Sequence, residues 1–340
     1  TKDRGQLLKL RGLVENYLLY EQVRKEFELA QGTSVDNTVT DLGKVDLTRG
    51  HPISDSPEIK RINDSIGYIN VPLDSLPSQG RYYPENTKIS IRAARVGEIR
   101  EFSTIDEKDV KDVTDKLTYI TSQCVKVYYG NVPGSYKDII TADRIVLILK
   151  IRELTFVEGQ SSIKIPVPSG ACKTVGCHPQ EYINFDTTCL SFVKPAEELE
   201  KYYDNVNRCY NIETKRFGTI TLYPPNIGVT TAITDWVVQQ QKDNKKIESS
   251  LAEILQFVIK DWRGLSDKMI FSKISELSGW STEKFTLTYR LVEKVNVGIE
   301  FDVHTHCETC GGEIEIPITF PDGYKSLFVP TISNLGEELL

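Results

Sequence analysis

Residues 298–328 read GIEFDVHTHCETCGGEIEIPITFPDGYKSLF, and this stretch decides how the C-terminal part of the chain folds. Apolar side chains alternate with polar side chains or proline on both sides of a short turn, namely Ile299, Phe301, Val303, Ile314, Ile316, Ile318 and Phe320. A period of two on both sides of a turn predicts an antiparallel hairpin with one buried face.

The turn of this hairpin, residues 307–312, reads CETCGG. Its two glycines accept backbone conformations with positive φ, which allow the thiols of Cys307 and Cys310 to face one metal ion. Two thiols do not complete a tetrahedral metal site, so the remaining ligands must come from elsewhere in the chain.

An earlier stretch of the chain repeats this order of elements. Residues 143–155 have a helical apolar pattern, and residues 163–167 alternate like a strand. Cys172 and Cys177 follow, and residues 182–185 form a return strand. The comparison rests on element order and cysteine position, so we treat it as a weak internal duplication. It predicts that the two thiol pairs share one metal ion.

Three arrangements of the metal site stay open. In the first, the two hairpin tips share one structural zinc ion through the thiolates of Cys172, Cys177, Cys307 and Cys310. In the second, one thiol pair is completed by neighbouring histidines, for which the candidates are His178, His304 and His306. In the third, no metal is bound. A four-thiolate site leaves no open position for water, so it would stabilise the fold and not catalyse a reaction.

The composition predicts a folded protein of two or three domains. Hydrophobic residues make up 39% of the 340 positions, which is enough to fill cores of that number. The longest unbroken apolar run, residues 145–149, is far shorter than the roughly 20 residues that span a bilayer. No signal-like segment opens the sequence, so we expect a soluble protein that is neither membrane-bound nor secreted.

The net charge and the number of cysteines limit the functions and the cellular compartment that the sequence favours. A formal net charge of −7 gives no overall attraction to polyphosphate, so we do not expect nucleic-acid binding. Seven cysteines, an odd number in a long chain, argue against a disulfide framework and for metal-bound thiols in a reducing compartment. We expect Cys124, Cys189 and Cys209 to be small buried residues.

Residues 1–32 form a predicted amphipathic helix, and residues 32–63 a polar tether. The helix carries apolar residues at spacings of three and four, which are Leu10, Leu13, Tyr17, Tyr20, Val23 and Phe27. Two interpretations stay open, since this stripe can pack on its own domain or dock on a neighbouring subunit. A tethered helix suits an assembly protein better than a compact enzyme. The candidate interface residues are Leu10, Leu13, Tyr17 and Tyr20.

Together these patterns predict an α+β protein of several subdomains, with short antiparallel hairpins, two zinc-knuckle-like hairpins and a C-terminal helical subdomain. The expected divisions are 1–65 (helix and arm), 66–140 (strands and helix), 141–230 (first knuckle hairpin and β region) and 231–340 (helices and C-terminal knuckle hairpin).

Local signals refine two of these divisions. In the second, a strand at 88–92 is followed by a helix-start signal at Ser103 and Thr104. In the last, apolar spacing predicts a helix whose buried face runs from Ile247 to Trp262 and another helix over about residues 282–294.

The sequence carries none of the common catalytic signatures. It has no glycine-rich phosphate loop ending in Lys-Ser or Lys-Thr, no His-Glu-x-x-His, no Gly-x-Ser-x-Gly and no dinucleotide fingerprint. We therefore expect a protein that is not an enzyme.

Residues 76–84 read LPSQGRYYP and precede the short strand KISIR at 88–92. This opening, the IRELT segment at 151–155 and the two later cysteine pairs resemble the baseplate hub proteins of T-even-type contractile-tail phages. The resemblance covers residues 76–328. The first cysteine pair departs from the family pattern because it encloses four residues instead of two, and the segment up to about residue 65 is an addition.

The resemblance implies a structural component of a phage tail baseplate, in or near the hub, that binds other tail and baseplate proteins. It also implies several copies in a symmetric assembly, built in the host cytoplasm and retained in the virion. Two alternatives stay open: a hub assembly chaperone that is absent from the mature virion, and a zinc-ribbon module that binds nucleic acid. The second is disfavoured by the net acidity and because Lys173 is the basic residue near the hairpin tips.

Overall fold

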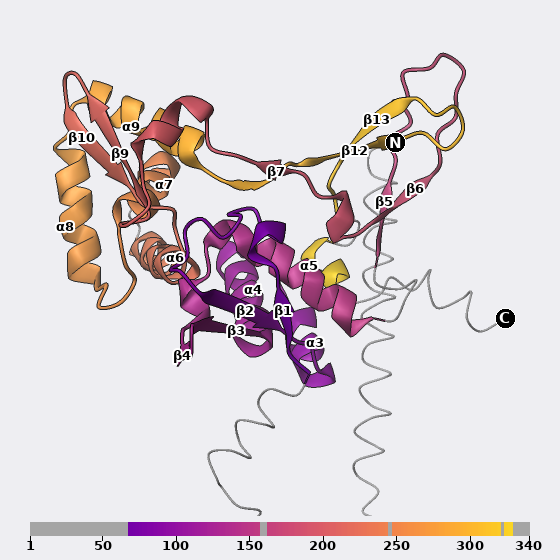
Figure 1. Ribbon diagram of the computed structural model, residues 1–340, viewed down its shortest axis with the longest axis horizontal. Coiled ribbons are helices and arrows are strands. Elements are labelled where there is room, and N and C mark those ends of the chain that lie inside the picture. Colours follow the sequence, from indigo (N-terminus) through magenta and orange to yellow (C-terminus); the bar gives the residue numbers. More distant parts are fainter. Residues whose placement is uncertain (1–66, 157–161, 244–246, 321–322, 329–340) are drawn as a thin grey trace, which may run out of the picture. The chain divides into compact units, whose positions relative to one another are not determined.

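The computed structural model describes residues 67–156, 162–243, 247–320 and 323–328. All of them belong to the second of the two units into which the chain divides, residues 65–340 (Figure 1). The predicted N-terminal helix and tether, with Leu10, Leu13, Tyr17 and Tyr20, lie outside the described residues. The described part combines helices with several short antiparallel sheets, so the predicted α+β class is confirmed.

A four-stranded antiparallel sheet opens the described part. Its strands follow the order β1 (Ile69–Val71), β2 (Thr87–Ile91), β3 (Val125–Tyr129) and β4 (Val132–Pro133). The predicted strand at 88–92 is β2, in which Ile89 and Ile91 are buried. Two helices connect β2 to β3, namely α3 (Val96–Ser103) and α4 (Val110–Cys124).

The predicted helix start at Ser103 and Thr104 is wrong. The hydroxyls of both residues donate to backbone carbonyls of the preceding turn, those of Arg100 and Glu101. Such local back-bonding competes with the start of a new helix, and here it accompanies the end of α3. Helix α4 begins later, with the side chain of Asp109 as its N-cap.

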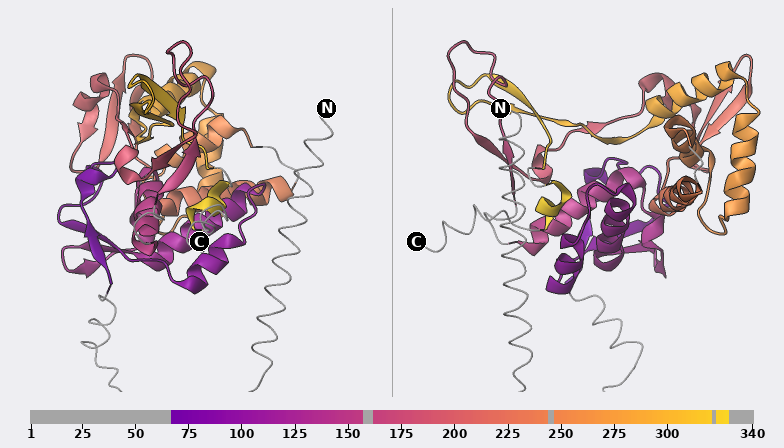
Figure 2. Two further views of the ribbon diagram at one scale, coloured as in Figure 1. Left: turned by 90° about the vertical axis from the view of Figure 1, so that its right-hand side faces the viewer. Right: turned by 180° about the vertical axis from the view of Figure 1, so that it is seen from behind.

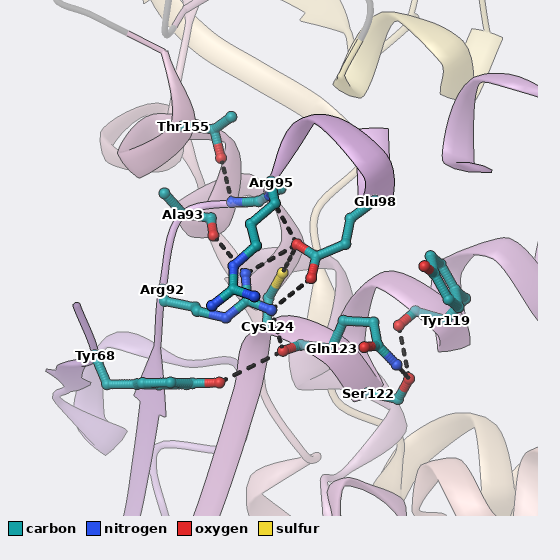
Figure 3. A network of polar contacts seen from close by, with 11 residues as sticks. Tyr68, Arg92, Ala93, Arg95, Glu98, Tyr119, Ser122, Gln123, Cys124 and Thr155 are labelled. Carbon is teal, nitrogen blue, oxygen red and sulfur yellow. Dashed lines mark hydrogen bonds and ion pairs between the residues drawn. The ribbon is translucent and has the colours of Figure 1, made fainter. Parts of the chain in front are cut away.

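A bidentate ion pair fixes the start of α3 to the end of β2 (Figure 3). The guanidinium of Arg92 donates to both carboxylate oxygens of Glu98, at 2.9 and 2.5 Å. The Arg95 backbone N–H donates to the same carboxylate at 2.7 Å. Burial alone would raise the pKa of Glu98, but these hydrogen bonds outweigh burial and lower the pKa to about 2. The Cys124 thiol lies 3.5 Å from this carboxylate, and burial raises its pKa to about 12.

Helix α5 (Arg144–Thr155) confirms the predicted helix at 143–155. It is buried on most of its circumference, as expected of a helix that is apolar all round. Its fully buried apolar residues are Val146, Leu147, Ile148, Leu149 and Ile151.

The segment 76–84 is tied to the start of α5 by a buried carboxylate. Asp143 accepts hydrogen bonds from the backbone N–H and hydroxyl of Ser78, at 2.8 and 2.6 Å, and from the Tyr83 hydroxyl at 2.6 Å. The Tyr83 hydroxyl also accepts from the Ile140 backbone N–H at 3.0 Å. Burial raises the pKa of Asp143, while its hydrogen bonds to Ser78 and Tyr83 act in the opposite direction. The turn is therefore part of the core.

Two hairpins carry the two cysteine pairs, and both were predicted. The first joins β5 (Ile163–Pro166) to β6 (Tyr182–Phe185), and the second joins β12 (Asp302–His306) to β13 (Glu313–Pro317). Alternation buries one face of each hairpin. The buried residues are Ile163, Ile165, Phe185, Val303, Ile314 and Ile316.

The predicted inward position of Phe301 is wrong, since its side chain is 80% exposed. The residues before it, β11 (Gly298–Ile299), pair instead with β7 (Phe192–Val193). The chain bends at Phe301 before β12 begins, so the alternation does not run through from β11 into β12.

The remaining elements form a three-stranded antiparallel sheet and a group of four helices. The strands follow the order β10 (Gly218–Leu222), β9 (Cys209–Thr214) and β8 (Tyr203–Asp204). The helices are α6 (Ile227–Lys242), α7 (Ser249–Val258), α8 (Asp267–Ser278) and α9 (Thr282–Val295). Short 3₁₀ helices lie at Leu73–Ser75, Tyr136–Asp138, Thr141–Asp143, Thr187–Cys189, Glu197–Tyr202 and Gly323–Leu327.

Helix α9 confirms the predicted helix at 282–294, but the predicted helical face from Ile247 to Trp262 is too long. Helix α7 ends at Val258, and Trp262 lies in the following turn. There its indole N–H donates to the Asp138 carboxylate at 2.8 Å.

Among the described residues, the buried apolar side chains other than that of Cys209 form one continuous hydrophobic cluster. The finer divisions near residues 140 and 230 stay predictions. Within the described residues, no helix combines the length and the apolar character needed to cross a bilayer.

Candidate metal centre

The four predicted cysteine ligands lie together, although they come from two hairpins far apart in the sequence. Their Sγ atoms all lie within 4.8 Å of one another. The Sγ atoms of Cys172 and Cys310 are 3.4 Å apart, and those of Cys177 and Cys307 are 3.6 Å apart. Figures 1 and 2 show the loop between β5 and β6 beside the loop between β12 and β13.

Tight turns place the thiols at the two tips. Gly311 has a φ of 72° and Gly176 a φ of 78°, a left-handed conformation that favours glycine. In the second hairpin, the Cys307 N–H donates to the Gly312 carbonyl and the Gly311 N–H donates to the Cys307 carbonyl, both at 2.8 Å. In the first, the Cys177 N–H donates to the Thr174 carbonyl at 3.1 Å.

Hydrogen bonds between the two tips hold them in contact. The hydroxyl of Thr309 donates to the backbone carbonyl of His178 at 2.8 Å. The backbone N–H of Glu308 donates to the side-chain oxygen of Gln180 at 3.1 Å. Polar contacts between the loops therefore contribute to the positions of the four thiols.

The spacing of the sulfur atoms fits a tetrahedral metal ion. With zinc–sulfur bonds of about 2.3 Å, the edge of a ZnS₄ tetrahedron is about 3.8 Å. The two closest sulfur pairs, at 3.4 and 3.6 Å, come near this length. They are much longer than a disulfide bond of about 2.05 Å, and all seven cysteines are free. The four cysteines could therefore hold a metal ion.

The electrostatics of the cluster also favour a bound cation. The hydrogen bond with the Thr174 hydroxyl, together with one from the Gly312 backbone N–H, lowers the pKa of Cys310 to about 6. The pKa of Cys177 is raised, by desolvation and by hydrogen bonds with the neighbouring thiols. Four thiolates this close repel one another, so all four ionise only when a cation compensates their charge.

The three candidate histidines lie outside this group of sulfur atoms. Cys307 is buried, whereas His304 and His306 are exposed on the other face of their strand. His178 is exposed as well, and it is its backbone carbonyl that contacts the second tip. Among the described residues, the gathered set of potential ligands consists of the four cysteines.

The other three cysteines are not members of the group. Cys124 and Cys209 are buried, as predicted, whereas Cys189 is half-buried. Sequence reasoning missed Thr174 and Gln180, which support the tips through side-chain contacts. Both are ordinary polar loop residues, and no periodicity distinguishes them. Only their position within or beside the first cysteine pair could have indicated a supporting role.

No protein-family model, curated protein or solved structure matches the chain.

Proposed function

We propose that the chain is a structural subunit of a contractile phage tail baseplate, in or near the hub, and that one structural zinc ion fixes its two zinc-knuckle hairpins. The observation that carries the zinc part of the proposal is the convergence of four thiols from two distant hairpins, all within 4.8 Å. The tail part rests on the sequence resemblance over residues 76–328.

Zinc is the metal that this donor set favours. Thiolates are soft ligands, and a tetrahedral S₄ set suits zinc or iron–sulfur chemistry, whereas calcium and magnesium prefer oxygen ligands. Two cysteine pairs on hairpin tips are typical of structural zinc sites. Four protein ligands leave no position for a reacting water, so the ion would act on stability and not on catalysis.

The segments that carry the resemblance have clear physical roles in this fold. In residues 76–84, Ser78 and Tyr83 bind the buried Asp143. In the segment 151–155, the Arg152 guanidinium donates to the backbone carbonyls of Ser326 and Leu327 at 2.8 and 2.7 Å. These contacts explain why this fold needs the residues of both segments, while the proposed family membership rests on the sequence resemblance alone.

A nucleic-acid-binding tip is a weaker proposal. Lys173 is accompanied at the tips by several carboxylates, which repel phosphates. The carboxylates are Glu308, Glu313 and Glu315. The second candidate function, after the structural subunit, is therefore the hub assembly chaperone that the same resemblance allows.

Mass spectrometry of purified tails from a phage that encodes this chain tests the proposal. We expect the chain in tail particles, together with other baseplate proteins. Its presence in infected cells but not in particles would favour the assembly factor. Its absence from every tail intermediate would refute both candidates.

A pair of variants tests the proposed interface of the N-terminal segment. Leu10→Asp with Tyr17→Asp is expected to abolish incorporation into particles while residues 65–340 stay folded. Arg11→Gln with Gln22→Asp changes the net charge by the same −2 on the opposite face of the predicted helix and is the matched control. Equal incorporation of both variants would exclude the stripe as the anchor.

A further inference from the structure

The exposed face of the β12–β13 hairpin carries metal-ligating side chains at alternate residues of each strand, which are neighbours on that face. His304 is paired across the strands with Glu315, and His306 with Glu313. All four are exposed, and Asp302 precedes them on the same face of β12. The opposite face of the hairpin holds the buried Val303, Cys307, Ile314 and Ile316.

The geometry of an antiparallel ladder brings these side chains within reach of one ion. Residues directly opposite each other have Cβ atoms about 5 Å apart, and residues two apart on one strand are separated by about 7 Å. A His-x-His pair with a carboxylate across the ladder can therefore present two imidazole nitrogens and one or two carboxylate oxygens to a single ion. Imidazole with carboxylate is a donor set that suits zinc, nickel and copper.

This face is also hollowed. A cavity of about 650 Å³ lies between it and the loop that carries Cys172. Both histidines, Asp302, Glu313 and Glu315 line the cavity, and Gly170, Ala171 and Lys173 line it from the loop. Thr305 and Ile314 also line it, from the strands themselves. The hollow therefore has room for a hydrated ion or a ligand that binds through it.

We propose that His304 and His306, with Glu313 and Glu315 opposite them, form a second binding site for a divalent transition-metal ion such as Zn²⁺. The site is separate from the four-cysteine group, because alternation along β12 points its donors to the other face of the hairpin. It goes beyond the proposed structural role and does not depend on it.

The second site is expected to be weaker than the first. Its side chains are exposed and must give up rotamer freedom to close on an ion, whereas the four thiols are already gathered. The contact recorded for the His304 side chain within the described residues is a long one, 3.9 Å from Nε2 to the Glu300 carboxylate, so an ion replaces little existing interaction. Where two or three protein donors bind the ion, a tetrahedral site keeps a coordination position open to water or to a donor from another molecule.

Metal titration of the full chain tests the proposal. Protein loaded with one Zn²⁺ is titrated with further Zn²⁺ by calorimetry, and the stoichiometry is read by native mass spectrometry. The wild-type chain is expected to take up a second, more weakly bound ion. The double variant His304→Gln, His306→Gln is expected to lose the second ion and keep the first. The double variant Glu313→Gln, Glu315→Gln is expected to lower the affinity for the second ion by roughly tenfold or more.

Two controls keep the result interpretable. His178→Gln removes the histidine that lies outside this face, and it is expected to bind both ions. Co²⁺ in place of Zn²⁺ separates the sites by spectrum, because thiolate ligands give sulfur-to-metal charge-transfer bands that nitrogen and oxygen ligands do not. These bands also report that the double histidine variant keeps its hairpins. Uptake of a single ion by the wild type, or unchanged uptake of the second ion by the double histidine variant, would overturn the proposal.

Discussion

The Sγ atom of Cys177 lies 3.6 Å from that of Cys307, although 130 positions separate the two residues in the sequence. The chain between them includes the three-stranded sheet and helices α6 to α9. An ion bound at this point joins the two ends of that segment. A covalent cross-link that closes a loop of about 100 residues lowers the conformational entropy of the unfolded chain, and this raises its free energy by roughly 4–5 kcal/mol. A tightly bound ion acts in the same way.

Removal of this ion is expected to lower stability without unfolding the whole protein at room temperature. A chelator, or the substitution Cys307→Ser, should reduce the free energy of unfolding by about 4 kcal/mol, because the loop constraint is lost. The four thiols lie in the loops of the two hairpins and not in helices α3 to α9, so helical circular dichroism should persist. Urea denaturation with and without chelator measures the change.

The matched control is Cys189→Ser, which removes a half-buried thiol outside the cluster. It should retain one zinc ion in native mass spectrometry and respond to chelator like the wild type. A chelator effect of the same size in Cys307→Ser as in the wild type would contradict the assignment of Cys307 as a ligand.

Without metal, Cys310 is expected to be the most reactive thiol of the cluster. Its pKa is lowered to about 6 by hydrogen bonds with Thr174 and the Gly312 backbone, and its side chain is exposed. At pH 7 most of it is therefore thiolate, which is the nucleophilic form. Alkylation by iodoacetamide, followed by peptide mass spectrometry, should label it first. Thr174→Val should slow this labelling, and faster labelling of Cys172 or Cys177 would contradict the prediction.

Stability should fall in acid because of Glu98. Its pKa is lowered from 4.5 to about 2 in the folded protein, so its carboxylate stabilises the fold fully above the unfolded value. This contribution is lost as the pH falls from about 5 to about 2, and it amounts to on the order of 2 kcal/mol. Urea denaturation across this range should show a shallower pH dependence for Glu98→Gln. Glu85→Gln, which removes an exposed carboxylate, is the control.

The sequence predicted those parts of the molecule that depend on local periodicity. Period-two alternation found both cysteine hairpins, and the repeated element order led to the four thiols that lie within 4.8 Å. Phe301 was misplaced because β11 pairs with β7, about a hundred residues earlier, and such a distant pairing leaves no local pattern. The histidines near the cysteines were candidates by proximity in sequence, and strand alternation directs two of them to the other face.

The role of Asp143 could not be predicted from the sequence, because its partners Ser78 and Tyr83 are 65 and 60 positions away. Asp143→Ala is expected to cost about 3 kcal/mol of stability, since it leaves three buried donors without an acceptor. Asp143→Asn keeps the shape and one acceptor oxygen, so it should cost less. Chemical denaturation compares the two variants. Equal stability of Asp143→Ala and the wild type would show that water replaces the carboxylate.

Arg152 is expected to hold the C-terminal 3₁₀ helix against α5. Its guanidinium donates to the carbonyls of Ser326 and Leu327 and, at 3.2 Å, to that of Ser162, and burial lowers its pKa to about 10. Lysine presents one ammonium group and cannot reproduce this fork, so Arg152→Lys should cost roughly 2–3 kcal/mol. The loss should be local at first, because residues 323–328 depend on these bonds. Hydrogen exchange should show faster exchange there, while Lys150→Ala, on the same helix, should leave exchange unchanged. Unaltered protection of residues 323–328 in Arg152→Lys would show that packing of Leu327 and Phe328 alone anchors the segment.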